Sequence, residues 1–216
     1  MSITLAVGTA VSIASTYGTS VAMTAITNAA SAVATLAAGH SVVVGDFLEI
    51  SSGWSLLDGR IARVSAVSTN DVTLESVNTV STTSYPVGTG TGTIRRITAW
   101  TQITQLAAGI QTSGGDQQFA DVTTLQDRTQ RQVPTRRSPI SVTLPGFFDQ
   151  SLGWVSTVRS ASDTATATGM RMVYPNGSRT VANAYWTLSD VPTIQDETLR
   201  SSISLSFSAQ PITYAT

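Results

Sequence analysis

Apolar residues occupy every second position in several stretches of the second half of the chain. Residues 202–208 alternate serine with isoleucine, leucine and phenylalanine without a break. Residues 138–144 have the same period, and residues 170–174 nearly repeat it. A period of two places one face of a strand in the core and the other toward solvent. The pattern therefore predicts β-strands with one buried face in all three stretches.

A hairpin signal follows the strand predicted over residues 170–174. Asn176 and Gly177 stand directly after it, preceded by Pro175. The dipeptide Asn-Gly favours a tight turn because both residues tolerate a positive φ. We expect the return strand over residues 179–186.

One segment has helical spacing instead. Leu152 and Val155 fall on one side of a helix, with Trp154 and Val158 beside them. Asp149 stands just before this segment, where an acidic side chain can cap a helix. We expect a single helix over residues 151–161, capped by Asp149.

The first half of the chain is built from shorter units. Residues 22–38 are rich in alanine, but threonine and valine recur and no charge marks a solvent face, which favours two short strands divided near Asn28. A Gly/Thr-rich loop over residues 85–93 ends this region. Short strands with glycine-rich turns at close spacing predict a small barrel or sandwich. Its further strands are expected at residues 42–50, 61–67 and 72–74.

Composition favours the same fold class. Only 12% of the 216 residues are charged, against about 25% in ordinary globular chains. Serine, threonine, alanine, valine and glycine dominate, and small β-branched residues suit a pleated, half-buried surface. The fold is therefore expected to be mainly β, with a largely neutral surface that favours contact with other proteins.

Charge and cysteine content narrow the possible functions. The twelve basic residues are all arginine, and thirteen acids give a net charge of −1. This balance lacks the basic footprint of a tight nucleic-acid binder. The chain has no cysteine, which excludes disulfides and thiolate metal sites. It shows neither a signal-peptide pattern nor an apolar run of about 18 residues, so we expect no contact with a membrane.

Candidates for catalysis are weak. His40 is the only histidine and stands in a glycine-containing turn, so a Ser-His-Asp hydrolase would depend on it alone. The glycines at 88, 90 and 92 do not fit a dinucleotide-binding spacing, and a P-loop needs a lysine that the chain lacks. Asp46, Glu49 and Asp58 do not fit a calcium-binding loop and are interpreted as a solvated barrel rim. We therefore predict no catalytic, cofactor-binding or metal-binding residue and no cofactor.

Arginine is concentrated in two places, the pair at 95–96 and a group of four at Arg128, Arg131, Arg136 and Arg137. No aromatic residues interleave with the group of four, as binding of single-stranded nucleic acid would favour. Asp121, Asp127 and Asp149 are near in sequence, so a salt-bridged protein interface is the preferred interpretation. A solvated loop with no partner is the alternative.

The order of elements in the second half resembles that of the lambda-type tail tube proteins of long-tailed bacteriophages. The resemblance covers about residues 1–16 and 98–216. Its upstream part corresponds to the family's long hairpin and the helix after it, and its downstream part to the hairpin and final strand. The stretches that carry it are 114–119, 123–127, 133–135, Phe148-Asp149, Tyr174-Pro175-Asn176-Gly177, Tyr185-Trp186, Pro192 and Ala209-Gln210-Pro211.

The resemblance implies a fold and a division of the chain. It implies a tail tube domain over residues 1–16 and 98–216, a β-sandwich with one flanking α-helix. Residues 17–97 depart from the family pattern. We expect them to form an inserted small β-barrel-like module.

The resemblance also implies a function. Proteins of this family form hexameric rings that stack into a tube, the conduit for DNA ejection. The chain is thus expected to be a structural protein of the virion tail, not an enzyme, that assembles in the cytoplasm of the host bacterium. Its implied partners are further copies of itself and the tape measure, tail terminator and baseplate or tail-tip proteins, while DNA passes through without specific binding.

Two sets of residues follow for this function. Arg128, Arg131, Arg136 and Arg137 lie near the tip of the hairpin predicted over residues 119–144, and we expect them to contact another subunit or ring. The resemblance implies that the strands flanking the tip and the C-terminal strand line the lumen, because the family builds its inner barrel from such sheet residues. Their outward positions carry mostly Ser, Thr and Gln, and the acids nearby, Asp121 and Asp127, are the candidates for lining the lumen. The alternative is that these acids only balance the interface arginines.

Two other functions fit parts of the sequence. One is a different virion component, such as a head decoration or tail-tip protein, which low charge and β-content suit equally. The other is a carbohydrate-binding module or glycosidase, which needs exposed tryptophans or paired carboxylates. The four tryptophans are scattered, and each has a plausible packing role: Trp54, Trp100, Trp154 and Trp186.

Overall fold

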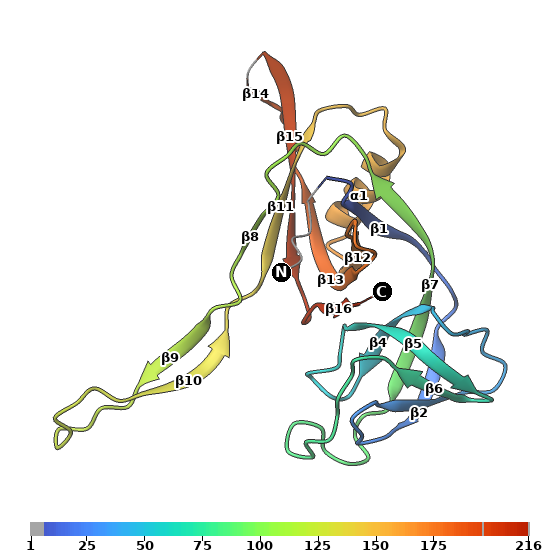
Figure 1. Ribbon diagram of the computed structural model, residues 1–216, viewed down its shortest axis with the longest axis vertical. Helices are drawn as coiled ribbons and strands as arrows, with labels where there is room; N and C mark the ends of the chain where they lie inside the picture. The colour runs from blue at the N-terminus through green and yellow to red at the C-terminus, as the bar shows by residue number, and fades with distance from the viewer. Residues whose placement is uncertain (1–6, 196, 216) are drawn as a thin grey trace.

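The computed structural model describes residues 7–195 and 197–215, which form sixteen strands and one α-helix (Figure 1). In chain order these elements are β1 (Ala10–Tyr17), β2 (Val21–Ile26), β3 (Val33–Leu36), β4 (Phe47–Ser52), β5 (Ile61–Ser68), β6 (Asp71–Leu74), β7 (Gly92–Ile103), β8 (Gln111–Ser113), β9 (Gln117–Asp121), β10 (Gln132–Arg137), β11 (Ser141–Phe147), α1 (Gly153–Asp163), β12 (Thr168–Val173), β13 (Arg179–Leu188), β14 (Thr193–Gln195), β15 (Thr198–Phe207) and β16 (Ile212–Tyr214). The predicted mainly-β class with one flanking helix is confirmed.

The central part of the molecule is an antiparallel sheet with strand order β7-β1-β12-β13-β15-β11-β8. The chain that leaves β7 comes back beside β11, where Leu106 bridges Gly146. The sheet therefore curls until its two ends approach each other. Helix α1 packs on the inside of the curl, where Trp154, Val155 and Val158 join a core supplied by the strands.

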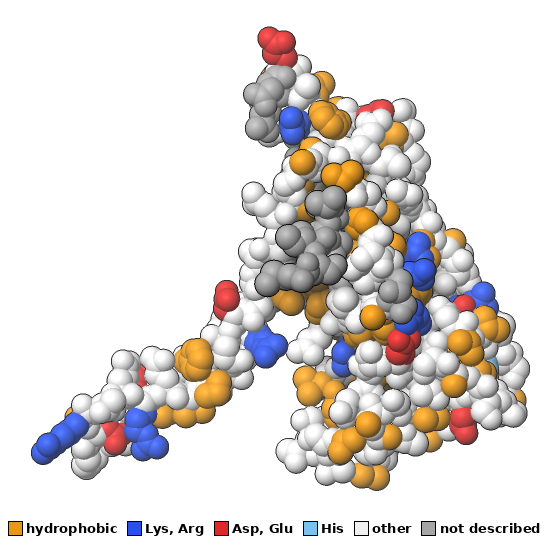
Figure 2. All heavy atoms as spheres, in the orientation of Figure 1, with side chains coloured by type: hydrophobic (Ala, Val, Ile, Leu, Met, Phe, Trp, Pro, Cys, Tyr) orange, Lys and Arg blue, Asp and Glu red, His pale blue; other side chains and the backbone are white. Residues whose placement is uncertain are grey.

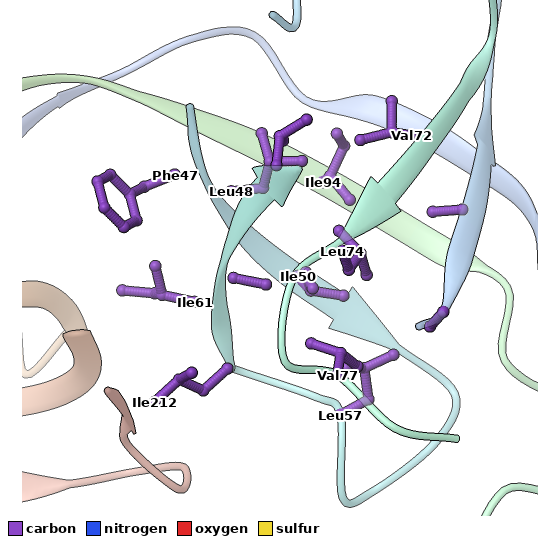
Figure 3. Close-up of a cluster of buried hydrophobic side chains, with 14 of the residues drawn as sticks. Phe47, Leu48, Ile50, Leu57, Ile61, Val72, Leu74, Val77, Ile94 and Ile212 are labelled. Carbon is purple, nitrogen blue, oxygen red and sulfur yellow. The ribbon is translucent and has the colours of Figure 1, made fainter. Parts of the chain in front are cut away.

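The shorter strands form a closed barrel. Its strand order is β2-β3-β6-β5-β4-β7, and the pairing of β2 with β7 completes the circle. Ile94 of β7 pairs with Val21 on one side and with Ile50 on the other. Figure 3 shows the barrel interior, filled by side chains such as Ile50, Leu74 and Ile94. The Ala-rich segment 22–38 forms two strands, β2 and β3, as predicted.

The barrel covers part of the face of the sheet opposite the helix. Side chains on β13 alternate between the two cores: Val181 belongs to the core of the barrel, whereas Ala182 belongs to the core under α1. Gly169 of β12 leaves room for the barrel, because a Cβ there would lie 3.0 Å from the Cδ1 of Ile61. The C-terminal strand β16 adds Ile212 and Tyr214 to the barrel core, and Figure 3 shows Ile212 beside it. Helix, sheet and barrel thus form three packed layers.

The start of the helix differs from the prediction. Helix α1 begins at Gly153, two residues later than expected, and Leu152 is its N-cap without a side-chain hydrogen bond. The carboxylate of Asp149 instead accepts hydrogen bonds from the backbone N–H and the hydroxyl of Ser151. Asp149 therefore shapes the turn before the helix, and the predicted cap was wrong. Trp154 and Val155, which directly follow the first helical residue, are buried.

The predicted hairpin after β12 is present. Gly177 donates its N–H to the carbonyl of Tyr174, and only Gly177 of the Asn-Gly pair has a positive φ, at 82°. Pro175 holds the second position of this turn, where its fixed φ near −65° suits a type I turn. Asn176 accordingly keeps a negative φ, and the glycine alone takes the left-handed conformation.

Candidate assembly surfaces

The residues considered for catalysis and metal binding have local structural roles. The Nε2 of His40 lies 3.0 Å from the carbonyl oxygen of Thr69, which ties together two loops of the barrel. Within the described residues, no group of three or more His, Asp or Glu side chains is arranged to hold a metal ion. The helix that the structure describes is too short to cross a membrane.

The three carboxylates interpreted as a barrel rim are separated by their contacts. Asp46 pairs with Arg96 at 3.2 Å, and Asp58 accepts a hydrogen bond from the N–H of Ser52. Glu49 is not on a solvated rim, because its side chain is only 12% exposed and contacts the sheet. The rim interpretation was therefore wrong for Glu49.

Glu49 belongs to a polar joint between barrel and sheet, whose members are too far apart in the sequence for any local pattern to indicate the contact. Its carboxylate accepts hydrogen bonds from Arg95 at 2.6 Å and from the buried side-chain amide of Asn183 at 2.9 Å. The guanidinium of Arg95 lies over the ring of Tyr17, 4.7 Å from its centroid. The hydroxyl of Tyr17 in turn accepts the N–H of Gly169 at 2.9 Å. These contacts fix the barrel against the sheet.

Two of the glycines at 88, 90 and 92 lie where barrel segments approach each other closely. A Cβ at Gly90 would lie within 2.6 Å of both Ile26 and Trp54, and one at Gly92 would overlap the carbonyl of Ser51. Such close approach between strands requires glycine. Packing therefore accounts for Gly90 and Gly92, whereas Gly88 has open space around it and adopts a φ of +81°.

A long β-arm, formed by β9, β10 and the loop over residues 122–131 between them, projects from the body of the molecule (Figure 1). Every residue of both strands is exposed. The arm continues from β8 and β11 through Gly114 and Gly115, both with φ of +83°. A Cβ at Gly114 would overlap the carbonyl of Pro139, so the chain can bend here only with glycine.

The four arginines of the predicted group all lie on the arm, but in two places. Arg128 and Arg131 are in the tip loop, whereas Arg136 and Arg137 end β10 near the base. All four are exposed, and none makes a salt bridge within the described residues. Figure 2 shows basic side chains at the free end of the arm. The tip thus offers guanidinium groups to other molecules.

Asp121 and Asp127 stabilise the tip loop. Asp121 accepts hydrogen bonds from the N–H and hydroxyl of Thr123, and these bonds lower the pKa of Asp121 below its ordinary value. Asp127 accepts from the N–H and hydroxyl of Thr124. The two acids therefore lie together at the far end of the arm, at the surface.

The arm also exposes apolar side chains that were not predicted as site residues. Leu125 at the tip is completely exposed, and Phe119 is 57% exposed. Ala120 pairs with Val133 across the two strands, so their side chains share one face. A two-stranded ribbon is at best marginally stable alone in water. The arm therefore has the properties of a segment that packs on another molecule.

A second surface is the open half of the face opposite the helix, which we call the hydroxyl face. Two rows of paired residues cross four strands there: Ser113, Ser141, Ser206 and Tyr185 in one, and Gln111, Thr143, Ser204 and Thr187 in the other. Neither row holds a charge. The first charged residue on this face is Arg200 at its upper end, whose guanidinium lies over the ring of Phe147 at 5.2 Å.

The hydroxyl face ends at a free strand edge. β8 pairs with β11 on one side, and no described strand pairs with its other side. A free edge presents unpaired backbone N–H and C=O groups that can bind another strand. The molecule thus combines an exposed arm, an open sheet edge and an uncharged polar face, and the first two are features suited to contacts with other protein chains.

Comparison with known proteins gives the family. The family model for the phage tail tube protein matches residues 52–216, so the chain belongs to the phage tail tube protein family. This identifies it as a structural component of a bacteriophage tail and confirms that it is not an enzyme. The match begins at the last residue of β4 and therefore includes the second half of the barrel as well as the sheet.

Two further comparisons were made. No curated protein gives a significant match. Among solved structures, a chain of the anti-feeding prophage cap (AFP tube terminating cap), determined by cryo-EM, is similar to this chain with 14% sequence identity and a TM-score of 0.38. That similarity covers 53% of this chain and 83% of the other.

Proposed function

We propose that the protein assembles into hexameric rings that stack to form the phage tail tube, the conduit for DNA ejection. The observation that carries the proposal is the β-arm, which exposes arginine and apolar side chains and packs on nothing in its own chain. In a stack of rings, the arm of one subunit would contact a neighbouring subunit or ring. This contact covers Leu125 and Phe119 and gives the arginines carboxylate partners.

Closure of a ring would also cover the free strand edge of β8. A free strand invites uncontrolled pairing, and a closed ring pairs each edge with a neighbour. Because β8 leads directly into the arm, one region of the subunit would supply both lateral and axial contacts. The β8 edge is therefore the proposed lateral contact.

The proposed site residues follow this arrangement. Arg128, Arg131, Arg136 and Arg137 form the contact surface between subunits or rings, with guanidinium groups suited to bidentate carboxylate pairing. Asp121 and Asp127 lie along the passage for DNA. The tape measure, tail terminator and baseplate or tail-tip proteins are the other partners, and the tube assembles in the cytoplasm of the host bacterium.

The proposal includes the division into a tube domain of residues 1–16 and 98–216, of which residues 1–6, 196 and 216 lie outside the described residues, and an inserted module of residues 17–97. The closed barrel supports a separate module. The two parts are nevertheless tightly joined, since β7 runs from Gly92 to Ile103 without a break. We therefore propose a module that is distinct in fold but fixed in orientation.

Electron microscopy of the purified protein tests the assembly. We expect tubes with six-fold averages in end views. The double variant Arg128→Ala/Arg131→Ala should remain a folded monomer but give shorter tubes or none at the same concentration. Arg179→Ala, which removes an exposed arginine from β13, is the matched control. Tubes of unchanged length in the double variant would contradict the proposed contact.

A further inference from the structure

We propose that the hairpin formed by β14 and the start of β15 docks into a groove at the base of the β-arm of a second copy of the chain, in the next ring of the stack. We call this hairpin, residues 193–195 and 197–200, the end ribbon, and the groove the basal groove. The inference rests on the proposed function and adds a contact that does not involve the tip of the arm.

The end ribbon exposes apolar and acidic side chains at one end of the molecule. Ile194 lies opposite Leu199 across the two strands, so their side chains share one face. They are 80% and 49% exposed. Glu197, in the turn between the strands, is exposed and makes no salt bridge within the part of the chain that the structure describes. Figure 2 shows acidic side-chain atoms at this end. An exposed apolar pair beside an unpaired carboxylate suits a contact with another protein.

The basal groove lies where the β-arm leaves the body of the molecule. Its lining includes Ile140, Phe207 and Pro211, all partly buried, and the exposed Pro139. The backbone N–H of Phe207 donates to the carbonyl of Ile140, which joins the two sides of the lining. Arg137, the last residue of β10, also lines the groove. The groove thus presents apolar side chains together with one guanidinium group.

The two surfaces are complementary in charge and in polarity. Arg137 makes no ion pair in its own subunit, so its guanidinium is free to bind the carboxylate of Glu197 with two hydrogen bonds. Ile194 and Leu199 then meet the apolar lining of the groove. The basic residues on the ribbon side are already engaged, since Arg159 pairs with Asp190 at 3.3 Å and Arg200 lies over Phe147.

Strand β15 relates the two surfaces in space. Its first residues belong to the end ribbon, and its last residue, Phe207, lines the basal groove. Its ten residues, at about 3.3 Å each, separate the two surfaces by roughly 30 Å. Figure 1 shows the ribbon at the top of the molecule and the arm leaving the opposite end of β11. A second copy shifted along this direction therefore brings its groove to the ribbon of the first.

The use of two different surfaces has a consequence for assembly. A contact between unlike surfaces is heterologous, and it repeats without closing when the copies are related by a shift along one direction. An open stack of rings needs a contact of this kind. The ribbon and the groove supply it at opposite ends of the same strand.

Exchange of the two charges tests the contact. Glu197→Arg and Arg137→Glu should each shorten the tubes several-fold at equal protein concentration, because each places like charges together. The double variant Glu197→Arg/Arg137→Glu should restore the native length distribution. Glu197→Arg/Arg136→Glu is the matched control and should stay short, since Arg136 neighbours Arg137 on β10 but does not line the groove. The unfolding temperature of each variant subunit checks that it is folded.

A disulfide tests proximity directly, because the chain has no cysteine of its own. Within one subunit, Ile194→Cys and Ile140→Cys would be roughly 25 Å apart along β15, at about 3.3 Å per residue, which is too far for a disulfide. Mild oxidation of tubes should therefore link subunits into a ladder of covalent multimers on a denaturing gel. Val87→Cys with Ile140→Cys moves one thiol to a similarly exposed apolar position and should give no ladder.

Three results would overturn the inference: native tube length in both single charge variants, a double variant no longer than the single ones, or no ladder from the cysteines at 194 and 140. A native protein that forms no tubes would instead contradict the proposed function. In that case a covalent ladder from the same cysteines would still support the docking of ribbon into groove, and its absence would refute it.

Discussion

At the scale of single residues, two tyrosines at the borders of the barrel have unusual environments. Tyr17 accepts the N–H of Gly169, and Tyr214 accepts the N–H of Arg63 at 2.8 Å. Desolvation by burial raises the pKa of Tyr17 to about 12, and burial has the same effect on the pKa of Tyr214. Both phenols therefore stay neutral in the folded protein at a pH where an unfolded chain ionises them.

This environment predicts alkaline instability. Below pH 10 the phenols are neutral in both states, and their contribution to stability is complete. Between about pH 10 and 12 the unfolded chain loses these protons first, so the free energy of unfolding falls by about 2–3 kcal/mol for each tyrosine. The free energy of unfolding, measured by chemical denaturation at several pH values across this range, checks the expected fall.

Tyr17→Phe separates the hydrogen bond that Tyr17 accepts from the effect of ionising its phenol. The variant should lose about 1–3 kcal/mol at pH 7, because the buried N–H of Gly169 loses its acceptor. It should also lose less stability than the native protein between pH 10 and 12. Tyr185→Phe, which alters an exposed tyrosine, is the control. An equal alkaline loss in the native protein and the Tyr17 variant would rule out this role of Tyr17.

Gly169 provides a second test at this scale. A methyl group there would lie 3.0 Å from Ile61 and 3.2 Å from Ala14 and Ile97, so these tightly packed side chains would have to move slightly to make room. Gly169→Ala is expected to reduce the free energy of unfolding by about 1–3 kcal/mol. Gly153→Ala, at the exposed start of α1 with open space around it, should be neutral or stabilising. Similar losses in both variants would show that the close packing of Ile61 is not the cause.

At the scale of elements, the β-arm is separate from the folding core. Its strands bury nothing in the rest of the chain, and its base is set by the left-handed glycines at 114 and 115. The energetic value of the arm must therefore come from contacts that it makes in an assembly.

Deleting residues 116–137 tests this separation. The deletion leaves Gly114, Gly115, Ser138, Pro139 and Ile140 as a loop between the paired Ser113 and Ser141, a length that hairpins tolerate. We expect an unchanged unfolding temperature by calorimetry and complete loss of tubes by electron microscopy. A large fall in the unfolding temperature would mean that the arm supports its own subunit, and tubes formed without it would refute its role in assembly.

At the scale of the whole molecule, side chains from the sheet strands are part of the barrel core, so the two parts are packed together. Val181 and Tyr214 lie in the barrel core although they belong to β13 and β16. Glu49 and Asn183, which are 134 positions apart, hold the joint by a hydrogen bond. We therefore expect one cooperative unfolding transition, with calorimetric and van't Hoff enthalpies equal. Two separate transitions would instead describe an independently folding module.

Local pattern determined much of this structure in advance. The alternation over residues 202–208 and the Asn-Gly turn after β12 depend on contacts between near neighbours, and both predictions are confirmed. The recurrence of threonine and valine in residues 22–38 likewise predicted the two strands β2 and β3 instead of a helix. The order of these elements was enough to indicate the tail tube family, which the match over residues 52–216 confirms.

Other features were decided only by tertiary structure. The sequence around Glu49 indicates a surface residue. In the structure, Asn183 of β13 packs on it, and its side chain is mostly buried. The four arginines form one group in the sequence, yet the strand end at Arg137 places two of them at the base of the arm and two at its tip. Which half of a strand is free depends on what packs across it, as Val181 and Thr187 show on β13. Periodicity fixes which face a side chain occupies, but only the distant partners of a strand decide whether that face is covered.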